Sequence, residues 1–281
     1  MRLLLHDTLA TLPFTLAFAE GWVAPAADLT VERRPELAAA ALGPGDAALL
    51  PTPEASLLVA SHPIAPAVAC VTDRAGTVSL RTPVRPDEVE RTPVRLAGVS
   101  SAAELLARGT LRAFYGIEPA HWERGESAEA QAVVLEGIEA LRPAEGGFAE
   151  DLSRAWFILT ALPFVSHLLV VPEEGGAAVA ERVVALLAEA RAAAHERRRA
   201  WRQPWVEREG IPRERFDEVM GGQRHALEPD DRRALTALLS HGGRGTPYQA
   251  PPEWRFVESR SRGVEESRSD ETTDNVTPSS S

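Results

Sequence analysis

Residues 151–171 read DLSRAWFILTALPFVSHLLVV, and this stretch holds the two patterns from which the fold is predicted. Asp151 is a good N-cap for a helix over Leu152–Leu159, because its carboxylate can accept hydrogen bonds from the free N–H groups of the first turn. Phe164–Val171 is a short, strongly apolar run that is typical of a buried strand. A helix followed directly by a buried strand indicates a protein in which helices cover sheets.

The same alternation continues on both sides of this stretch and predicts an α/β fold. The other predicted strands are Arg2–Leu5, Asp46–Leu50, Pro66–Val71, Thr77–Thr82, Val94–Leu96 and Gln131–Leu135. The other predicted helices are Thr11–Glu20, Ala102–Phe114, Val179–Trp201, Pro212–Gly221 and Asp230–Ser240. Ser101 and Glu104 have the spacing of a capping box at the start of one of these helices. Pro204 is expected to follow the end of the longest one.

Composition excludes several classes of function. The 281 residues carry a net charge of −11, which disfavours binding to nucleic acid or to an anionic membrane. All 30 basic residues are arginine, so Schiff-base chemistry and a Walker lysine are excluded. The single cysteine, Cys70, excludes an intramolecular disulfide and a cysteine-rich metal site. The seven histidines show no metal-binding spacing, so no metal is expected.

The two ends of the chain differ in character. The apolar stretch that ends at Ala19 resembles a secretory signal, but His6 and Asp7 interrupt it and Pro13 divides it. A strand, a loop and an apolar helix explain the same residues, and we therefore expect a cytoplasmic protein. Residues 259–281 are rich in serine, threonine and mixed charges, and their composition predicts a disordered tail.

Two polar segments follow predicted strands. His6, Asp7 and Thr8 come at the carboxyl end of the first strand, where open α/β sheets bind ligands. Ser100 and Ser101 precede a predicted helix, whose free N–H groups make a seat for a carboxylate. Each segment can equally be explained as an ordinary helix cap, so neither names a function by itself.

Several stretches together resemble the menaquinone-biosynthesis enzymes of the futalosine pathway, and chorismate dehydratase in particular. The segment 151–165 is similar to the family pattern Asp-Leu, tryptophan, then Thr-Gly-x-Pro-Phe-Val. The weaker similarities are in Leu9–Pro13, in Gly45–Leu50 with Glu54, in Ser100–Ser101 with Leu111–Gly116, and in Arg224–Leu227. They occur in order over roughly residues 2–240.

The resemblance implies a two-lobed fold like that of the type II periplasmic solute-binding proteins, with three-layer α/β lobes and a ligand cleft between them. It assigns residues 1–82 and 168–258 to one lobe and residues 83–167 to the other. The polar ends of strands from the two lobes are then expected to converge at the cleft.

The activity that the resemblance implies is a carbon–oxygen lyase (a hydro-lyase), which removes water from chorismate to give 3-((1-carboxyvinyl)oxy)benzoate. It implies a small carboxylate substrate and neither a metal nor another cofactor. Under this hypothesis the substrate-binding residues are Thr11, Thr52, Ser100, Ser101, Gly137 and Thr160. The candidates for the general base are His6, Asp7 and Glu54.

The sequence also departs from the family pattern at polar positions of the cleft. Ala10 replaces an asparagine, Ala97 an aspartate, and Ile138 the aspartate of a Gly-Asp pair. The chain therefore resembles a divergent member of the family. Two alternatives remain: a non-catalytic or re-specialised carboxylate-binding protein of the same fold, and the sister enzyme that forms 1,4-dihydroxy-6-naphthoate.

Overall fold

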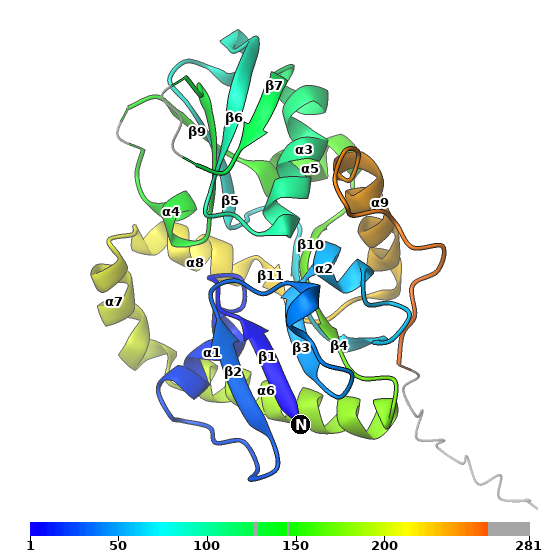
Figure 1. The fold of residues 1–281 in the computed structure, drawn as a ribbon. Helices are drawn as coiled ribbons and strands as arrows, with labels where there is room; N and C mark the ends of the chain where they lie inside the picture. Colours follow the sequence, from blue (N-terminus) through cyan, green and yellow to red (C-terminus); the bar gives the residue numbers. More distant parts are fainter. Residues whose placement is uncertain (126–128, 145, 258–281) are drawn as a thin grey trace, which may run out of the picture.

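The computed structural model describes residues 1–125, 129–144 and 146–257, which fold into two α/β lobes (Figure 1). The predicted tail, residues 259–281, lies outside the described residues. One lobe is built on a six-stranded sheet with the order β11-β4-β10-β3-β1-β2. Its strands are β1 (Arg2–His6), β2 (Thr30–Arg34), β3 (Ala47–Pro51), β4 (Ile64–Thr72), β10 (Phe164–Val170) and β11 (Gln223–Arg224).

The other lobe is built on a five-stranded sheet with the order β7-β6-β8-β5-β9. Its strands are β5 (Val78–Thr82), β6 (Arg91–Ala97), β7 (Glu118–Glu123), β8 (Ala132–Glu136) and β9 (Phe148–Asp151). In the first sheet β1 pairs in parallel with β2 and β3, and in the second β6 pairs in parallel with β7 and β8. The carboxyl ends of β1, β3, β6 and β8 all reach the cleft between the lobes.

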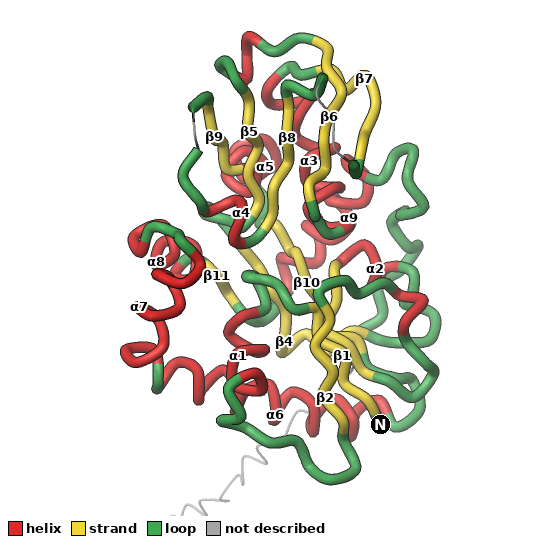
Figure 2. The backbone as a smooth tube through the Cα atoms, turned by 60° about the vertical axis from the view of Figure 1, so that its left-hand side comes forward, coloured by secondary structure: helices red, strands yellow, loops and turns green. Residues whose placement is uncertain are grey.

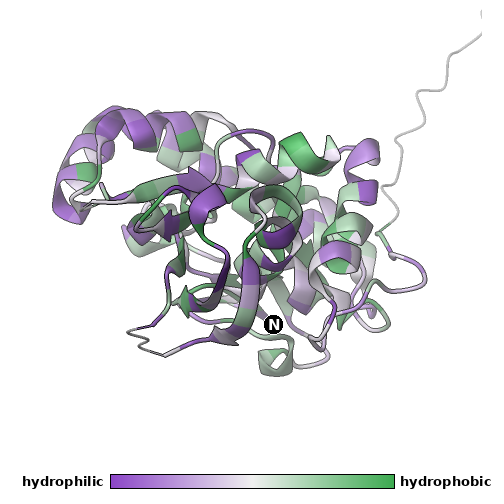
Figure 3. Ribbon diagram, turned by 90° about the horizontal axis from the view of Figure 1, so that it is seen from above, coloured by the Kyte–Doolittle hydropathy of each residue, from purple (hydrophilic) through white to green (hydrophobic). Residues whose placement is uncertain are grey.

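The helices cover both sheets (Figures 1 and 2). They are α1 (Leu12–Ala19), α2 (Thr52–Ser56), α3 (Ser101–Tyr115), α4 (Ile138–Leu141), α5 (Leu152–Thr160), α6 (Gly176–Glu196), α7 (Arg198–Glu209), α8 (Arg213–Gly221) and α9 (Arg232–Gly242). Three short 3₁₀ turns are Ala39–Ala41, Pro86–Glu88 and Pro229–Asp231. Hydrophilic residues predominate along the helices that protrude at the left of Figure 3, α7 and α8.

Helix α9 joins the two lobes through its buried face. Leu238 and Leu239 pack into the core of the five-stranded sheet together with Trp156 of α5. Ala234 and Leu235, one turn earlier, pack into the core of the six-stranded sheet. Because neighbouring turns of one helix are buried in both cores, α9 fixes part of one lobe against the other.

The chain crosses between the sheets earlier than the sequence predicts. Thr77–Thr82 was expected in the first lobe, but β5 pairs with β8 and β9 of the second sheet. Likewise β10, which begins at Phe164, belongs to the first sheet. The sheet boundaries therefore fall at residues 73–77 and 161–163, in place of the expected positions after residues 82 and 167. The segment 73–77, between β4 and β5, is the first crossover.

Asp151 is confirmed as the N-cap of α5, and it also holds the crossover in place. Its Oδ1 accepts hydrogen bonds from the N–H groups of Ser153 (2.9 Å) and Arg154 (3.2 Å). Its Oδ2 accepts from the Gly76 N–H at 2.9 Å and from the Arg215 guanidinium of α8 at 3.1 Å. The stretch that indicated the fold class thus also ties the start of β5 and α8 to the second lobe.

Two local expectations are wrong. The predicted helix over residues 179–201 is two helices, which bend at Arg197, and Pro204 lies inside the second one, α7. The bend lets the Trp201 indole donate to the Ala194 carbonyl at 2.8 Å and its ring pack edge-on against Phe216. Ser101 and Glu104 do not form a capping box, because Ser100 is the N-cap of α3.

Four strands were not predicted, namely β2, β7, β9 and the two-residue β11. The first three are largely exposed or half-buried and carry charged side chains, and β11 consists of a glutamine and an arginine, so none has an apolar run. Among the described residues, none of the helices is both long enough and apolar enough to cross a lipid bilayer. Within the same ranges no three His, Cys, Asp or Glu side chains come together as a metal site.

Candidate active site

A cavity of about 1300 Å³ lies between the lobes. Its walls come from the carboxyl ends of the parallel strands, the start of α3, helices α1 and α7, and Tyr248 in the segment after α9. The convergence of strand ends from both sheets follows the general placement of ligand sites in open α/β sheets. This cleft is the candidate active site.

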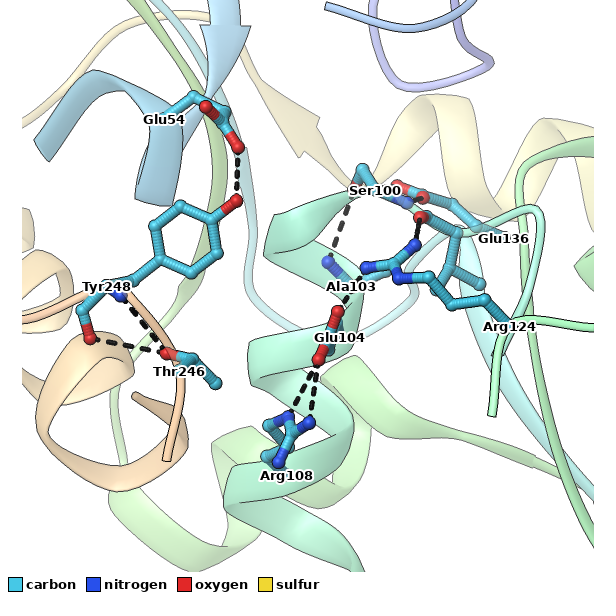
Figure 4. A network of polar contacts seen from close by, with 10 residues as sticks. Glu54, Ser100, Ala103, Glu104, Arg108, Arg124, Glu136, Thr246 and Tyr248 are labelled. Atoms are coloured by element: carbon cyan, nitrogen blue, oxygen red, sulfur yellow. Dashed lines mark hydrogen bonds and ion pairs between the residues drawn. The ribbon is translucent and has the colours of Figure 1, made fainter. Parts of the chain in front are cut away.

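Glu136, the last residue of β8, occupies the N-terminus of α3 (Figure 4). Its Oε2 accepts a hydrogen bond from the Ser100 N–H at 2.6 Å, and its Oε1 accepts from the Ser100 hydroxyl at 3.0 Å. The Ser100 hydroxyl in turn accepts from the Ala103 N–H at 3.2 Å and so caps the helix. The Ser100 N–H and hydroxyl, which were expected to bind a ligand carboxylate, therefore bind the Glu136 carboxylate of the chain itself.

The Glu136 carboxyl is a group that can accept and release protons in the cleft. Burial raises its pKa, because the charged form loses water, and the two hydrogen bonds from Ser100 lower the pKa by less. The next residue, Gly137, has a φ of 68° and a ψ of −131° that only glycine adopts readily. This turn ends β8 and leaves the Glu136 side chain at the cleft wall.

Glu54 and Tyr248 form a second pair of polar groups at the cleft. Glu54 Oε2 accepts from the Ala39 N–H at 2.8 Å, and Oε1 accepts a short hydrogen bond from the Tyr248 hydroxyl. Burial, followed by the contact with Glu54, raises the pKa of Tyr248 to about 12. The phenol is therefore neutral at pH 7 and remains a proton donor. Ser101 lies beside this phenol, yet its buried hydroxyl has no hydrogen bond of good geometry.

His6 lies at the cleft floor with both ring nitrogens engaged. Its Nε2 is 3.1 Å from the Pro35 carbonyl, and because a carbonyl only accepts, this nitrogen carries the proton. In neutral His6 the other nitrogen, Nδ1, then accepts from His167 Nε2 at 2.8 Å. His167 Nδ1 accepts from the Ser166 hydroxyl at 3.0 Å. This chain of hydrogen bonds leaves His6 without a free nitrogen for a substrate proton.

The third expected base, Asp7, lines the cleft and lies 3.6 Å from the Arg33 guanidinium. Two further arginines, Arg124 and Arg208, line the same cavity. Arg124 donates to Glu104 and to the Val99 carbonyl, whereas Arg208 donates to Glu209 at 3.0 Å. Three cations are outnumbered by the acidic side chains of the wall, which are Asp7, Glu20, Glu36, Glu54, Glu136, Glu139 and Glu209.

Six expected residues line the cleft, and three do not. His6, Asp7, Glu54, Ser100, Ser101 and Gly137 line it. Thr11 and Thr52 are fully buried, and their hydroxyls donate to the His6 and Val165 carbonyls. Thr160 ends α5, and its hydroxyl donates to the Trp156 carbonyl at 2.8 Å. These threonines satisfy backbone groups inside their own lobes and do not line the cleft.

Sequence reasoning missed Glu136 and Tyr248. A signal existed for Glu136, because it is the polar residue directly after the predicted strand Gln131–Leu135 and hence lies at a carboxyl end. No comparable signal existed for Tyr248, which reaches Glu54 across 194 positions of the chain.

The comparison with protein families finds one match, to the family described as menaquinone biosynthesis, over residues 29–244. None of the curated proteins matches the sequence.

Several solved structures share the architecture. Protein AF1704 from Archaeoglobus fulgidus is 17% identical, with a TM-score of 0.61 over 86% of this chain and 96% of that one. The periplasmic aliphatic sulphonate binding protein SsuA from Escherichia coli is 12% identical, with a TM-score of 0.57 over 100% and 97%. The alkanesulfonate-binding protein SsuA from Xanthomonas axonopodis pv. citri, bound to MOPS, is 15% identical, with a TM-score of 0.56 over 85% and 91%. These likenesses show a two-lobed, periplasmic-binding-protein-like fold.

Proposed function

Because the chain belongs to the menaquinone-biosynthesis family, we propose that it is an enzyme of that route, a hydro-lyase that converts chorismate into 3-((1-carboxyvinyl)oxy)benzoate. The observation that carries the proposal is the Glu136 carboxyl, which faces a cleft of about 1300 Å³ with a raised pKa. A cleft carboxyl with a raised pKa is a better proton acceptor than an ordinary carboxylate.

The proposed reaction needs one base and one proton donor. A base removes the ring proton at C3, its C–H electrons form the new ring double bond, and the C4–O bond breaks. The leaving hydroxide takes up a proton to become water, and the ring becomes aromatic. In this proposal Glu136 takes the ring proton. The neutral Tyr248 phenol, whose O–H donates to Glu54 in the free protein (Figure 4), turns to the leaving hydroxide and gives it that O–H proton; the phenolate then regains a proton from solvent, and Glu136 releases its own to solvent. No metal or other cofactor takes part in the proposed steps.

The substrate has two carboxylates, and we propose that the cleft arginines bind them. Arg33, Arg124 and Arg208 line the cavity, and guanidinium groups bind carboxylates with charge-assisted hydrogen bonds. The Ser100 N–H and hydroxyl are already used by Glu136. The expected role of Ser100 as a direct carboxylate ligand is therefore replaced by a positioning role toward Glu136.

A second candidate function is favoured by the charge of the cleft. Seven acidic side chains against three arginines disfavour a dianion, and Glu136 already takes the Ser100 N–H and hydroxyl at the start of α3. These features fit a re-specialised binding protein of the same fold that takes a less negatively charged ligand, or the sister enzyme that forms 1,4-dihydroxy-6-naphthoate. Turnover of chorismate distinguishes the first candidate from both.

The test follows formation of the aromatic enol ether from chorismate by chromatography, for the wild-type protein, Glu136→Gln and Glu139→Gln. Glutamine keeps an oxygen that can accept from Ser100 but cannot take the ring proton. We expect Glu136→Gln to lower kcat by about 10²- to 10⁴-fold, the usual contribution of a general base. Glu139 is the matched control, since it lines the same wall but is exposed and paired with Arg142.

Wild-type turnover together with an unchanged kcat in Glu136→Gln would remove Glu136 from the mechanism. No turnover by the wild-type protein, with thermal stabilisation by a less negatively charged ligand, would favour the second candidate. Equal losses of kcat in Glu136→Gln and Glu139→Gln would indicate that turnover depends on the overall charge of the cleft and not on Glu136 as the proton acceptor.

A further inference from the structure

A second cavity of about 400 Å³ lies away from the cleft, between α6, α7, α8 and the start of α1. Figure 2 shows these four helices around one another on one side of the first lobe. Helix α7 contributes to both cavities, with Trp205 toward the cleft and Trp201 toward the second cavity. The two cavities are thus separate sites on a shared helix.

The titratable side chains that line this second cavity are all basic residues. Arg191, His195, Arg198 and His225 line it, and no acidic residue does so among the described parts of the chain. Arg198 is paired with Asp217 at 3.0 Å. Arg191 is exposed and makes no ion pair or hydrogen bond with any described residue. In a chain of net charge −11, an unpaired arginine in a basic pocket indicates an anionic ligand.

His225 adds a polar group that the protein leaves unsatisfied. Its Nε2 is buried without a hydrogen-bond partner, and its ring packs edge-on against Phe14 at 5.4 Å. Burial, and secondarily the nearby Arg191 charge, lowers the pKa of His225 to about 4. The imidazole is therefore neutral at pH 7, so it does not repel Arg191 and leaves that cation available to a ligand.

The remaining wall is aromatic and apolar. The Trp201 Nε1–H is used by the Ala194 carbonyl, so the indole offers its ring surface. The fully buried Phe216 ring packs edge-on against this indole, with the two ring centroids 6.0 Å apart. Met220 lies half-buried beside them. Flat apolar surface next to a fixed cation is the arrangement that suits an aromatic anion.

We propose that this cavity binds a small aromatic carboxylate, with its ring against Trp201 and Met220 and its carboxylate paired with Arg191. The volume is within the range of small-molecule sites. The site is independent of the proposed reaction in the cleft, because none of its residues belongs to the cleft wall.

Isothermal titration with 2-naphthoate tests the proposal, using the neutral isostere 2-naphthamide as the ligand control. We expect one-site binding with a Kd of about 1 mM or tighter, as for a ligand of this size. Arg191→Gln should weaken it at least about tenfold, the contribution of a charge-assisted pair. Arg199→Gln, an exposed arginine of α7 outside the cavity, should leave it unchanged.

Ala188→Glu gives a second variant that removes no buried packing, because Ala188 is exposed at the cavity wall. Its carboxylate should repel the ligand and abolish measurable binding, whereas chorismate turnover in both variants should equal that of the wild type. The proposal is overturned by absent binding of 2-naphthoate, by equal affinity for 2-naphthamide, or by unchanged affinity in Arg191→Gln and Ala188→Glu. Loss of turnover alone would bear on the cleft reaction and not on this site.

Discussion

At the residue scale, the pair His6 and His167 makes the stability of the first lobe depend on pH. Their rings are joined by a hydrogen bond of 2.8 Å, and burial lowers the pKa of both imidazoles because it penalises the charged forms. In the unfolded chain both imidazoles have a pKa of about 6.5. Below that pH the unfolded state binds protons that the folded state does not, so stability is present above about pH 6.5 and is lost as pH falls.

We therefore expect His167→Gln to have a shallower loss of stability on acidification than the wild type. Glutamine can still donate an N–H to His6 but has no proton to gain. Urea unfolding at about pH 7.5 and pH 5.5 measures the slope for each protein. His121→Gln, at an exposed position, is the control and should retain the wild-type slope. Identical slopes in the wild type and His167→Gln would contradict this account.

At the element scale, helix α3 depends on Ser100 and not on its neighbour. Ser100 caps the helix and also donates to Glu136, whereas the buried Ser101 hydroxyl has no hydrogen-bond partner among the described residues. We expect Ser100→Ala to lower the free energy of unfolding by about 1 kcal/mol, the usual cost of an N-cap.

Ser101→Ala should be neutral or slightly stabilising, because it removes an unsatisfied buried hydroxyl. Urea unfolding of the two single variants under one buffer condition makes the comparison. A cost in Ser101→Ala equal to that in Ser100→Ala would show that both hydroxyls support the helix start.

The helices and strands were predictable in proportion to how apolar they are. β1, β3, β4 and β10 are largely buried runs, and each was expected within a few residues of its place. The charged strands β2 and β7 were missed, since they are edge strands whose pairing with a neighbour, and not their own sequence, makes them strands. The break at Arg197 was missed for a related reason, because packing of Trp201 on Phe216 decides it.

At the scale of the whole molecule, charge should govern how an anionic substrate enters. The chain carries −11, and acidic side chains outnumber arginines at the cleft wall. Salt screens this repulsion, with a Debye length of about 10 Å at 0.1 M. We expect KM for chorismate to fall as ionic strength rises from about 20 to 200 mM, with kcat little changed.

Steady-state kinetics over this range of sodium chloride, with potassium glutamate as a second salt, measures the effect. A rise in KM with both salts would show that the cleft arginines dominate the field at the entrance. A change with one salt only would indicate specific ion binding.

The sequence by itself determined the α/β class, the buried strands, the Asp151 cap, and the segments that follow β1 and β6 as places for polar groups. Each of these depends on residues within a few positions of one another, where periodicity and cap chemistry act. Only the tertiary structure decided which groups meet. Glu136 reaches Ser100 across 36 positions, His6 reaches His167 across 161, and Tyr248 reaches Glu54 across 194.

Such pairs carry no local signal, because closing a long loop costs an entropy that only the packing of both lobes offsets. The same packing decided that Thr11, Thr52 and Thr160 satisfy backbone carbonyls inside their lobes, away from the cleft. Residue type and spacing therefore indicated which edge of the sheets carries the site. Only the packing of the two sheets and α9 against one another placed the Glu136 carboxyl in that site.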